Sequence, residues 1–182
     1  NIGTYDESTK TWTYKNLYVG TYDAPVYNNP NDVANAMNIG YDSEKNAASF
    51  NANNIYLRTK SVLSVKDGGS LNLAGGILIN YKENGGNWDT AYKGTSALNI
   101  EKGAFVKTKF LRGYHYANLK IDSKVDVFSS NSGASIYVAQ GATEFGANAE
   151  VTTTTGYIEF GGLVGKPSDI INVFCKKAVE II

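Results

Sequence analysis

The sequence predicts an all-β protein built as a parallel β-helix, or β-solenoid, with an atypical N-terminal cap. Three observations lead to this prediction. The chain of 182 residues is rich in Gly, Asn, Ser, Thr and Tyr but contains only 3 Pro, a composition that favours strands joined by tight turns. Apolar and polar residues alternate on both sides of short turns, and this strand–turn–strand pattern recurs about every 20 residues.

The stretch SVKDGGSLNLAGG, residues 64–76, belongs to the first repeat unit. Leu63 and Val65 alternate with polar neighbours, a Gly-rich turn follows, and the alternation resumes at Leu71. Three later segments follow the same pattern: ALNIEKGAFVKT from Ala97, NLKIDSKVDVFS from Asn118 and SIYVAQGATEFG from Ser135. Each unit therefore predicts two short strands, apolar on one face, that meet at a corner.

The spacing of the units favours a solenoid. Leu98 and Leu119 are 21 residues apart, and Leu119 and Ile136 are 17 apart. The longer interval before Leu98 contains the polar insertion YKENGGNWDTAYKGTS. The alternative is an antiparallel β-sandwich, whose turns recur about every 8 to 12 residues. Sandwich hairpins favour Asn-Gly or Asp-Gly in two-residue loops; Asp67-Gly68 fits, whereas most other corners do not.

Equivalent positions in successive units predict the core. Ile100, Ile121 and Val138 occupy the same place in their units, so we expect them to point inward and to stack in register. Glu144 departs from the pattern, because it falls where a core residue is expected. Either a bulge turns Phe145 inward, or that strand ends early.

The N-terminal part differs from the repeated middle. We expect residues 1–50 to form the N-terminal cap region and residues 51–182 to form the solenoid coils with a closing segment, all within one structural domain. Within the cap, Asn31 or Asp32 is a suitable N-cap for a short helix near residues 30–38.

The C-terminal segment PSDIINVFCKKAVEII is apolar and rich in β-branched residues. It is either a set of closing strands or a short helix that begins at Ser168. In both cases we expect Phe174 to be largely buried, because a large aromatic side chain exposed among β-branched residues promotes aggregation.

Charge and hydropathy exclude several classes of partner. The chain carries 17 basic and 17 acidic residues, so it has no basic footprint for nucleic acid and no net attraction to an anionic membrane. No apolar run reaches the roughly 18 residues of a membrane-spanning helix, so we expect no membrane insertion by this segment. Cys175 is the single cysteine, which excludes an internal disulfide and predicts a small buried side chain.

Three segments carry a resemblance to a known family. YVGTYDAPVY (residues 18–27), FNANNIYL (residues 50–57) and SVKDGGSLNLAGG resemble the passenger domains of vacuolating-cytotoxin-type autotransporters. The resemblance covers residues 11–80, and beyond them only the general β-helix style is similar. It implies a right-handed parallel β-helix that is secreted through an outer-membrane β-barrel.

The resemblance also implies an extracellular or cell-surface location and a part in virulence through adhesion or host interaction. The expected partner is a host-cell surface protein or a glycan, and the oligomeric state is left open. The chain lacks the family's apolar N-terminal segment and its C-terminal barrel. We therefore expect no pore formation, and we expect the chain to be at most a piece of a passenger.

The densest polar and aromatic cluster, KFLRGYHYANLK, contains Arg112, Tyr114, His115 and Tyr116. Some parallel β-helices are polysaccharide lyases or hydrolases, so an Arg or His in an outer groove is a candidate base. Such enzymes need converging carboxylates, which the spacing of the acids does not provide. One His and one Cys are also too few for an assembled zinc site. We therefore expect no catalytic residue, no metal and no cofactor.

Tyrosines at or near strand and insertion positions form a candidate ligand-contact surface. Aromatic side chains beside polar ones bind partners, but they also stabilise pairs between neighbouring strands. The candidate contact residues are Tyr81, Tyr92, Arg112, Tyr114, His115, Tyr116 and Tyr137. The predicted function is non-enzymatic adhesion. The alternatives are a carbohydrate-active or glycan-binding β-helix module and a structural segment of a fibre or cell wall.

Overall fold

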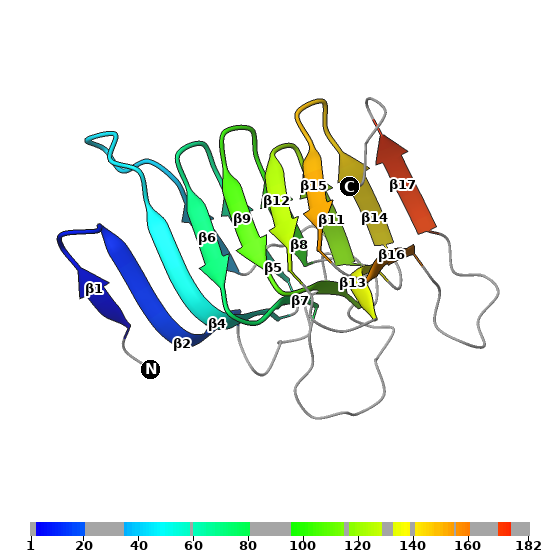
Figure 1. Cartoon of the computed structure of the whole chain (residues 1–182), viewed down its shortest axis with the longest axis horizontal. Helices are drawn as coiled ribbons and strands as arrows, with labels where there is room; N and C mark the ends of the chain where they lie inside the picture. Colours follow the sequence, from blue (N-terminus) through cyan, green and yellow to red (C-terminus); the bar gives the residue numbers. More distant parts are fainter. Residues whose placement is uncertain are drawn as a thin grey trace.

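The computed structural model is all-β, as the alternation of apolar and polar residues predicts (Figure 1). It describes residues 3–20, 35–58, 60–80, 96–114, 117–128, 133–138, 141–154, 156–160 and 171–175. These ranges contain strands β1 to β17 and no helix. Accordingly, the described part of the chain has no helix with the length and apolar character needed to cross a membrane.

Six strands form the smaller of two sheets. Each pairs in parallel with its neighbours. In spatial order the strands are β17 (Ile171–Cys175), β14 (Gly141–Phe145), β11 (Ala117–Ile121), β8 (Ala97–Ile100), β5 (Ser61–Val65) and β3 (Asn35–Ile39).

Eleven strands form the larger sheet. Its main path runs through β15 (Glu150–Thr153), β12 (Lys124–Val127), β9 (Phe105–Thr108), β6 (Ser70–Leu73), β4 (Ser49–Leu57), β7 (Ile77–Ile79), β10 (Leu111–Gly113), β13 (Ala134–Val138) and β16 (Tyr157–Phe160). Two further strands lie at its N-terminal end: β2 (Thr11–Val19) pairs with β4, and β1 (Thr4–Asp6) pairs with β2.

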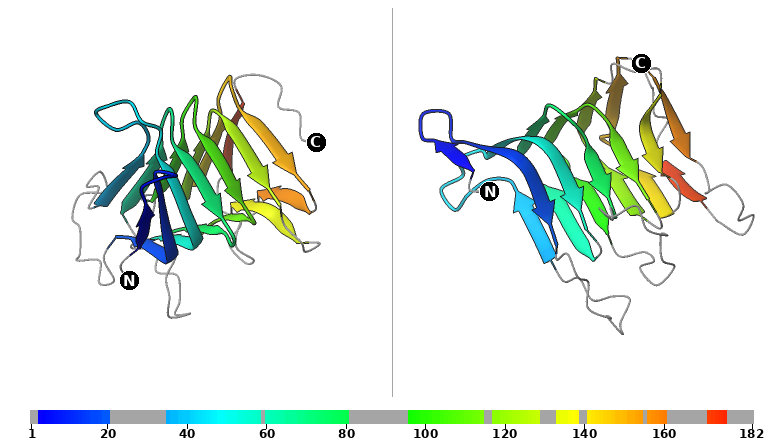
Figure 2. Two further views of the ribbon diagram at one scale, coloured as in Figure 1. Left: turned by 60° about the vertical axis from the view of Figure 1, so that its left-hand side comes forward. Right: turned by 90° about the horizontal axis from the view of Figure 1, so that it is seen from below.

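The chain winds in repeated turns that each contribute three strands. From β5 in the smaller sheet it passes through β6 and β7 in the larger sheet and returns as β8, which lies beside β5. The strands β8–β9–β10, β11–β12–β13 and β14–β15–β16 repeat this course, and Figure 2 shows the successive turns side by side. In β4 a single long strand pairs with both β6 and β7.

Strand direction rules out the antiparallel β-sandwich for the described residues. Among their strand pairs only β1–β2 is antiparallel, and all the others are parallel. Parallel neighbours cannot be joined by a two-residue hairpin, so the chain must cross to other strands before it returns. The coarse prediction of an all-β chain with mostly parallel strands is therefore confirmed.

The core is built from rows of equivalent residues that cross the strands. Alternate side chains of each strand point inward. Ile100 and Ile121 are adjacent in register and have 0% exposure, as expected from their places in the repeat. The inward row of the smaller sheet that contains them runs through Ile39, Val65, Ile100, Ile121 and Phe145.

The expected register of Val138 is wrong. Val138 is buried, but it lies on β13 of the larger sheet, opposite Gly113 and Phe160. The residue in register with Ile121 is Phe145. The segment from Ser135 alternates like the other units, but its first half belongs to β13 and its second half to β14, which starts the next turn. The expected alignment matched the first half, instead of the second, with β11.

This correction also explains Glu144. Strand β14 pairs with β11 without a break in register, so Thr143 and Phe145 face the core while Glu144 faces outward. The Glu144 carboxylate lies 3.7 Å from the Lys120 ammonium group on the neighbouring strand. Phe145 is buried without a bulge and without early termination of the strand.

The local structure of the two ends of the described chain tests two further expectations. Residues Asn35–Ile39 form a strand paired with β5, so the helix expected near residues 30–38 is wrong for this part, and residues 30–34 lie outside the described ranges. Propensity is overridden here because Met37 and Ile39 align with the core residues Leu63 and Val65.

At the C-terminal end, Ile171–Cys175 forms strand β17, which agrees with a closing strand. Phe174 and Cys175 are in register with Glu144 and Phe145, but the burial of their side chains lies outside the description. Strand β4 crosses position 50, where the N-terminal cap region was expected to end. That division of the chain stays a prediction.

The Gly-Gly corner of the first unit is required by close contacts. Gly68 has a φ of 74°, a backbone angle that residues other than Gly rarely adopt, and the ring of Tyr41 lies against it. A Cβ atom on Gly69 would collide with the carbonyl oxygen of Ile39 on the adjacent turn. Two glycines therefore allow the neighbouring turns to approach each other at this corner.

Candidate functional site

Three of the predicted contact residues lie together on the outer face of the larger sheet. Arg112 on β10 and Tyr137 on β13 are paired in register, and Tyr114 follows β10 directly. The Tyr114 and Tyr137 rings meet edge to face with 6.3 Å between centroids. The other predicted contact residues lie outside the described ranges: Tyr81, Tyr92, His115 and Tyr116.

Arg112 and Tyr137 belong to a longer line of outward-facing residues that we call the outer row. Register places one residue from each successive strand in this line. The outer row runs Tyr18, Tyr56, Leu78, Arg112, Tyr137 and Glu159. Each turn of the chain adds one member, so the fold aligns residues that are far apart in sequence. Leu78, in the middle of the row, is buried with 9% exposure and separates the two tyrosines from the other members.

Aromatic and cationic contacts order the outer row. The Tyr18 and Tyr56 rings stack with 4.8 Å between centroids and 12° between planes, and the Arg58 guanidinium lies 4.7 Å above Tyr18. The Arg112 guanidinium lies 4.7 Å from the centroid of the Phe110 ring. Such contacts hold flat, partly exposed faces in place, which is a suitable surface for a bound partner.

The electrostatic setting of Tyr137 differs from that of an ordinary surface tyrosine. Partial burial is the main cause that raises the pKa of its phenol above 10.0, and the nearby Glu159 carboxylate and Tyr114 add to the shift. The phenol is therefore a neutral hydrogen-bonding group over the whole physiological pH range.

The surroundings of Arg112 bear on the carbohydrate-enzyme alternative. Its register neighbours are Leu78 and Tyr137, and the first carboxylate along the row is Glu159, two strands away. Within the ranges that the structure describes, no three His, Cys, Asp or Glu side chains are grouped so that they could hold a metal ion. The described residues thus offer stacking and hydrogen bonding at Arg112.

A second candidate site, the N-terminal groove, lies at the end of the stack where β2 meets β3 and β4. It has a volume of about 670 Å³. Trp12, Tyr14 and Phe50 form its aromatic floor, and residues 37–42 of β3 and the following turn form one side. The corner residues Lys66, Asp67 and Glu101 complete its rim.

The aromatic floor is the end of the core. Trp12 and Tyr14 occupy inward positions of β2, in register with Phe50 and Ala52 of β4. The Tyr14 and Phe50 rings stack with 4.8 Å between centroids and 11° between planes, and the Trp12 and Tyr14 centroids are 5.9 Å apart. Phe50 is 6% exposed, whereas Trp12 is 41% exposed. Tyr5 on β1 is in register with Trp12 and ends this row, with 4.8 Å between the centroids of the two rings. Trp12 nevertheless lines the groove.

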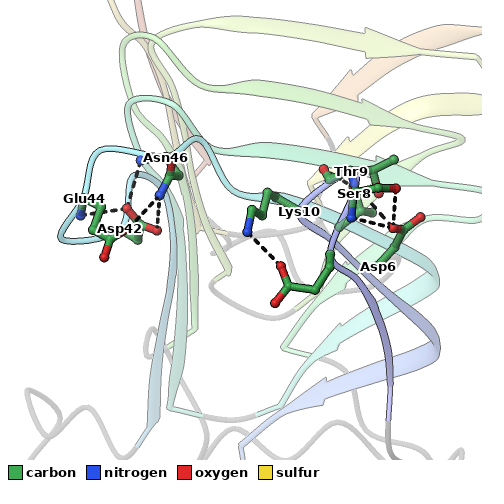
Figure 3. Close-up of polar contacts among 9 residues, drawn as sticks. Asp6, Ser8, Thr9, Lys10, Asp42, Glu44 and Asn46 are labelled. Carbon is green, nitrogen blue, oxygen red and sulfur yellow. Dashed lines mark hydrogen bonds and ion pairs between the residues drawn. The ribbon is translucent and has the colours of Figure 1, made fainter.

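A hydrogen-bonded loop shapes the rim (Figure 3). Asp42 Oδ1 accepts hydrogen bonds from the backbone N–H groups of Glu44 and Asn46, each at 2.8 Å, and Asp42 Oδ2 accepts one from Asn46 Nδ2 at 3.0 Å. The Asn46 bonds are the main cause that lowers the pKa of the Asp42 carboxyl below 3.8, and the charge of Lys10 contributes.

Across from this loop, the Lys10 ammonium group lies 2.8 Å from Glu7 on the same turn (Figure 3). This hydrogen bond is the main cause that raises the pKa of Lys10. The positive charge of Lys10 is thus largely compensated by Glu7. Asp42 remains an anion at the rim at any physiological pH.

Sequence reasoning missed the N-terminal groove. Its one local signal is the segment TWTYKNLYV, in which Trp12 and Tyr14 alternate with polar residues on one face of a strand. Tyr41 and Phe50 reach the same place only because β3 and β4 stack on the first turn.

Comparison with known proteins adds no family: no family model, curated protein or solved structure matches this chain.

Proposed function

We propose that the chain is a parallel β-helix that serves as a non-enzymatic binding domain of an extracellular or cell-surface protein, in adhesion or host interaction. The observation that carries this proposal is the outer row, in which Tyr18 and Tyr56 on one side of the buried Leu78, and Arg112, Tyr137 and Glu159 on the other side, are in register on the outside of parallel strands. The resemblance of residues 11–80 to autotransporter passengers supports the location and the type of partner.

The pairing pattern supports the β-helix. In both sheets a strand pairs with its counterpart from the next turn, and inward residues such as Leu63, Leu98 and Leu119 form rows along the stack. One turn cannot bury its apolar face alone, whereas stacked turns bury it continuously. An elongated stack also presents long outer surfaces, which suits a protein that binds other molecules at a cell surface.

The outer row also has a purely structural interpretation, in which its contacts only stabilise neighbouring strands. Binding and stability separate the two interpretations. Arg112 is exposed and Tyr137 is partly exposed, so truncation of either side chain leaves the core intact. If the row is a binding surface, truncation reduces binding more than it reduces stability.

The test measures binding of the purified chain to host cells and to immobilised host-cell surface proteins. Arg112→Ala and Tyr137→Ala should each weaken binding about tenfold or more, as residues at the centre of an interface do. Lys120→Ala on the outer face of the smaller sheet is the matched control and should bind as the wild type does. Equal binding by all variants, with lower melting temperatures for the outer-row variants, would support the structural interpretation instead.

A glycan array distinguishes a protein receptor from a glycan ligand. The exposed rings of the outer row are able to stack on either kind of partner, so the array decides between the two forms of the proposal. Polysaccharide cleavage that disappears in Arg112→Ala or His115→Ala would overturn the non-enzymatic assignment and favour the carbohydrate-active alternative.

A further inference from the structure

We propose that the N-terminal groove binds an extended basic peptide segment, which adds to the edge of β3 and places a Lys or Arg side chain over Trp12 and Tyr14. The proposal rests on three features that the structure brings together: an aromatic floor, a sheet edge and an acidic rim. The groove is separate from the outer row, so this inference does not depend on the proposed function.

The floor offers an aromatic surface that the fold leaves partly uncovered. Further along the inward row of Trp12 and Phe50, Leu71 and Val106 have 0% exposure. Trp12 is 41% exposed, although the ring of Tyr5 packs against it with 4.8 Å between centroids. A tryptophan face is the preferred partner of a Lys or Arg side chain in cation–π contacts.

The edge of the smaller sheet forms one side of the groove. Strand β3 is the last strand of that sheet, and among the described residues it pairs with β5 alone. An unpaired edge presents N–H and C=O groups to which an extended peptide adds by backbone hydrogen bonds. Alternate side chains of such a peptide point toward the groove, as Met37 and Ile39 do on β3.

The net negative charge of the rim favours a positively charged ligand. Three carboxylates line the groove, those of Asp42, Asp67 and Glu101, against the single ammonium group of Lys66. These four rim residues are exposed, so they attract a basic peptide and repel an acidic one without being buried in the free protein. The nearby Lys10 is paired with Glu7 and leaves this balance unchanged.

The test is fluorescence anisotropy with a labelled peptide of alternating Val and Lys, about nine residues long, to match the length of a strand. We expect saturable binding that weakens several-fold when salt is raised from about 0.05 M to 0.5 M. A Val–Glu peptide of the same length should not bind. Amide groups of β3 should gain protection from hydrogen exchange when the Val–Lys peptide is bound.

Matched variants assign the binding to the groove. Trp12→Ala should weaken peptide binding at least tenfold, whereas Tyr157→Ala, which removes an exposed aromatic ring at the other end of the stack, should not. Glu101→Lys should weaken binding about tenfold, and Glu150→Lys on β15 should leave it unchanged. Because Glu101 and Glu150 are exposed, both charge reversals keep the fold intact.

Several outcomes would overturn the proposal. One is the absence of Val–Lys binding, and another is equal binding of the Val–Glu peptide. A third is binding that survives both Trp12→Ala and Glu101→Lys. Self-association that disappears in Trp12→Ala would assign the groove to a second copy of the chain, and competition by a neutral glycan alone would assign it to carbohydrate. Tyr137→Ala should leave peptide binding unchanged, which keeps this test independent of the outer row.

Discussion

Replacement of Thr143 by Val should stabilise the protein, although it removes a polar group. Thr143 faces the core on β14, next to Leu119, with 0% exposure. Its hydroxyl oxygen has no hydrogen-bond partner among the described residues. A buried hydroxyl without a partner costs about 1–3 kcal/mol, and Val fills nearly the same volume without that cost.

We therefore expect Thr143→Val to increase the free energy of unfolding by about 1–2 kcal/mol. For a chain of this length, each kcal/mol corresponds to a rise of about 2–4 °C in the melting temperature. Urea unfolding followed by circular dichroism measures the change. The midpoint should rise while its slope with urea stays constant, because the surface exposed on unfolding is the same.

Thr108→Val is the matched control, because it makes the same chemical change in a different environment. Thr108 also has 0% exposure, but its hydroxyl lies 3.1 Å from the carbonyl oxygen of Gly75, to which it donates. Its replacement should lower the free energy of unfolding by about 1 kcal/mol. If Thr143→Val destabilised the protein as much as Thr108→Val does, the Thr143 hydroxyl would have a partner and the reasoning would be refuted.

Three further predictions concern the core and two ionisable groups. Ile121→Asp should lower the free energy of unfolding by more than about 4 kcal/mol, because it places an unpaired carboxylate at a position with 0% exposure; wild-type melting would show that this side chain does not face the core. Asn46→Ala should raise the pKa of Asp42 toward 3.8, measured by NMR titration. Since the pKa of Asp42 is lower in the folded chain, its ionised carboxylate stabilises the fold above about pH 3.8, and this stabilisation is lost as the pH falls through the pKa of the folded state. An unchanged pKa in Asn46→Ala would contradict the assigned cause. Glu159→Gln should lower the pKa of Tyr137 only part of the way to 10.0, because burial, the main cause, remains; a spectrophotometric titration that returned fully to 10.0 would assign the shift to Glu159.

The local alternation was sufficient to predict strands and corners in the middle of the chain. The segments around Leu63, Leu98 and Leu119 each form inward-facing strands, and these three leucines are in register. This succeeded because side-chain direction in a strand has a period of 2, which the sequence displays directly.

The assignment of strands to sheets could not be read from the same pattern. In two turns the third strand, β7 or β10, is only 3 residues long and shows too few alternations to be recognised. The third strand β13 has 5 residues, and its alternation suits either sheet. The segment from Ser135 therefore predicts a place in the smaller sheet, whereas Ile136 is in register with Leu111 in the larger one. Long-range pairing decides between such alignments, because both bury the same apolar residues.

Of the two candidate surfaces, the outer row could be predicted in part from the sequence, whereas the N-terminal groove could not. The sequence predicted Arg112, Tyr114 and Tyr137 as candidate contact residues, and the structure places them on one face. It contained no sign that Trp12 and Glu101 would line one groove, since these residues are far apart in the chain.

The sequence by itself determined that the chain is all-β, with apolar faces that require stacking, because composition and a period of 2 are local properties. Only the tertiary structure decided which turn each strand joins, which side chains form the outer row, and that Trp12 remains partly exposed at one end. The physical reason is that rows and grooves arise from register between successive turns. Register depends on how whole strands bury their apolar faces together, which no short segment of sequence specifies.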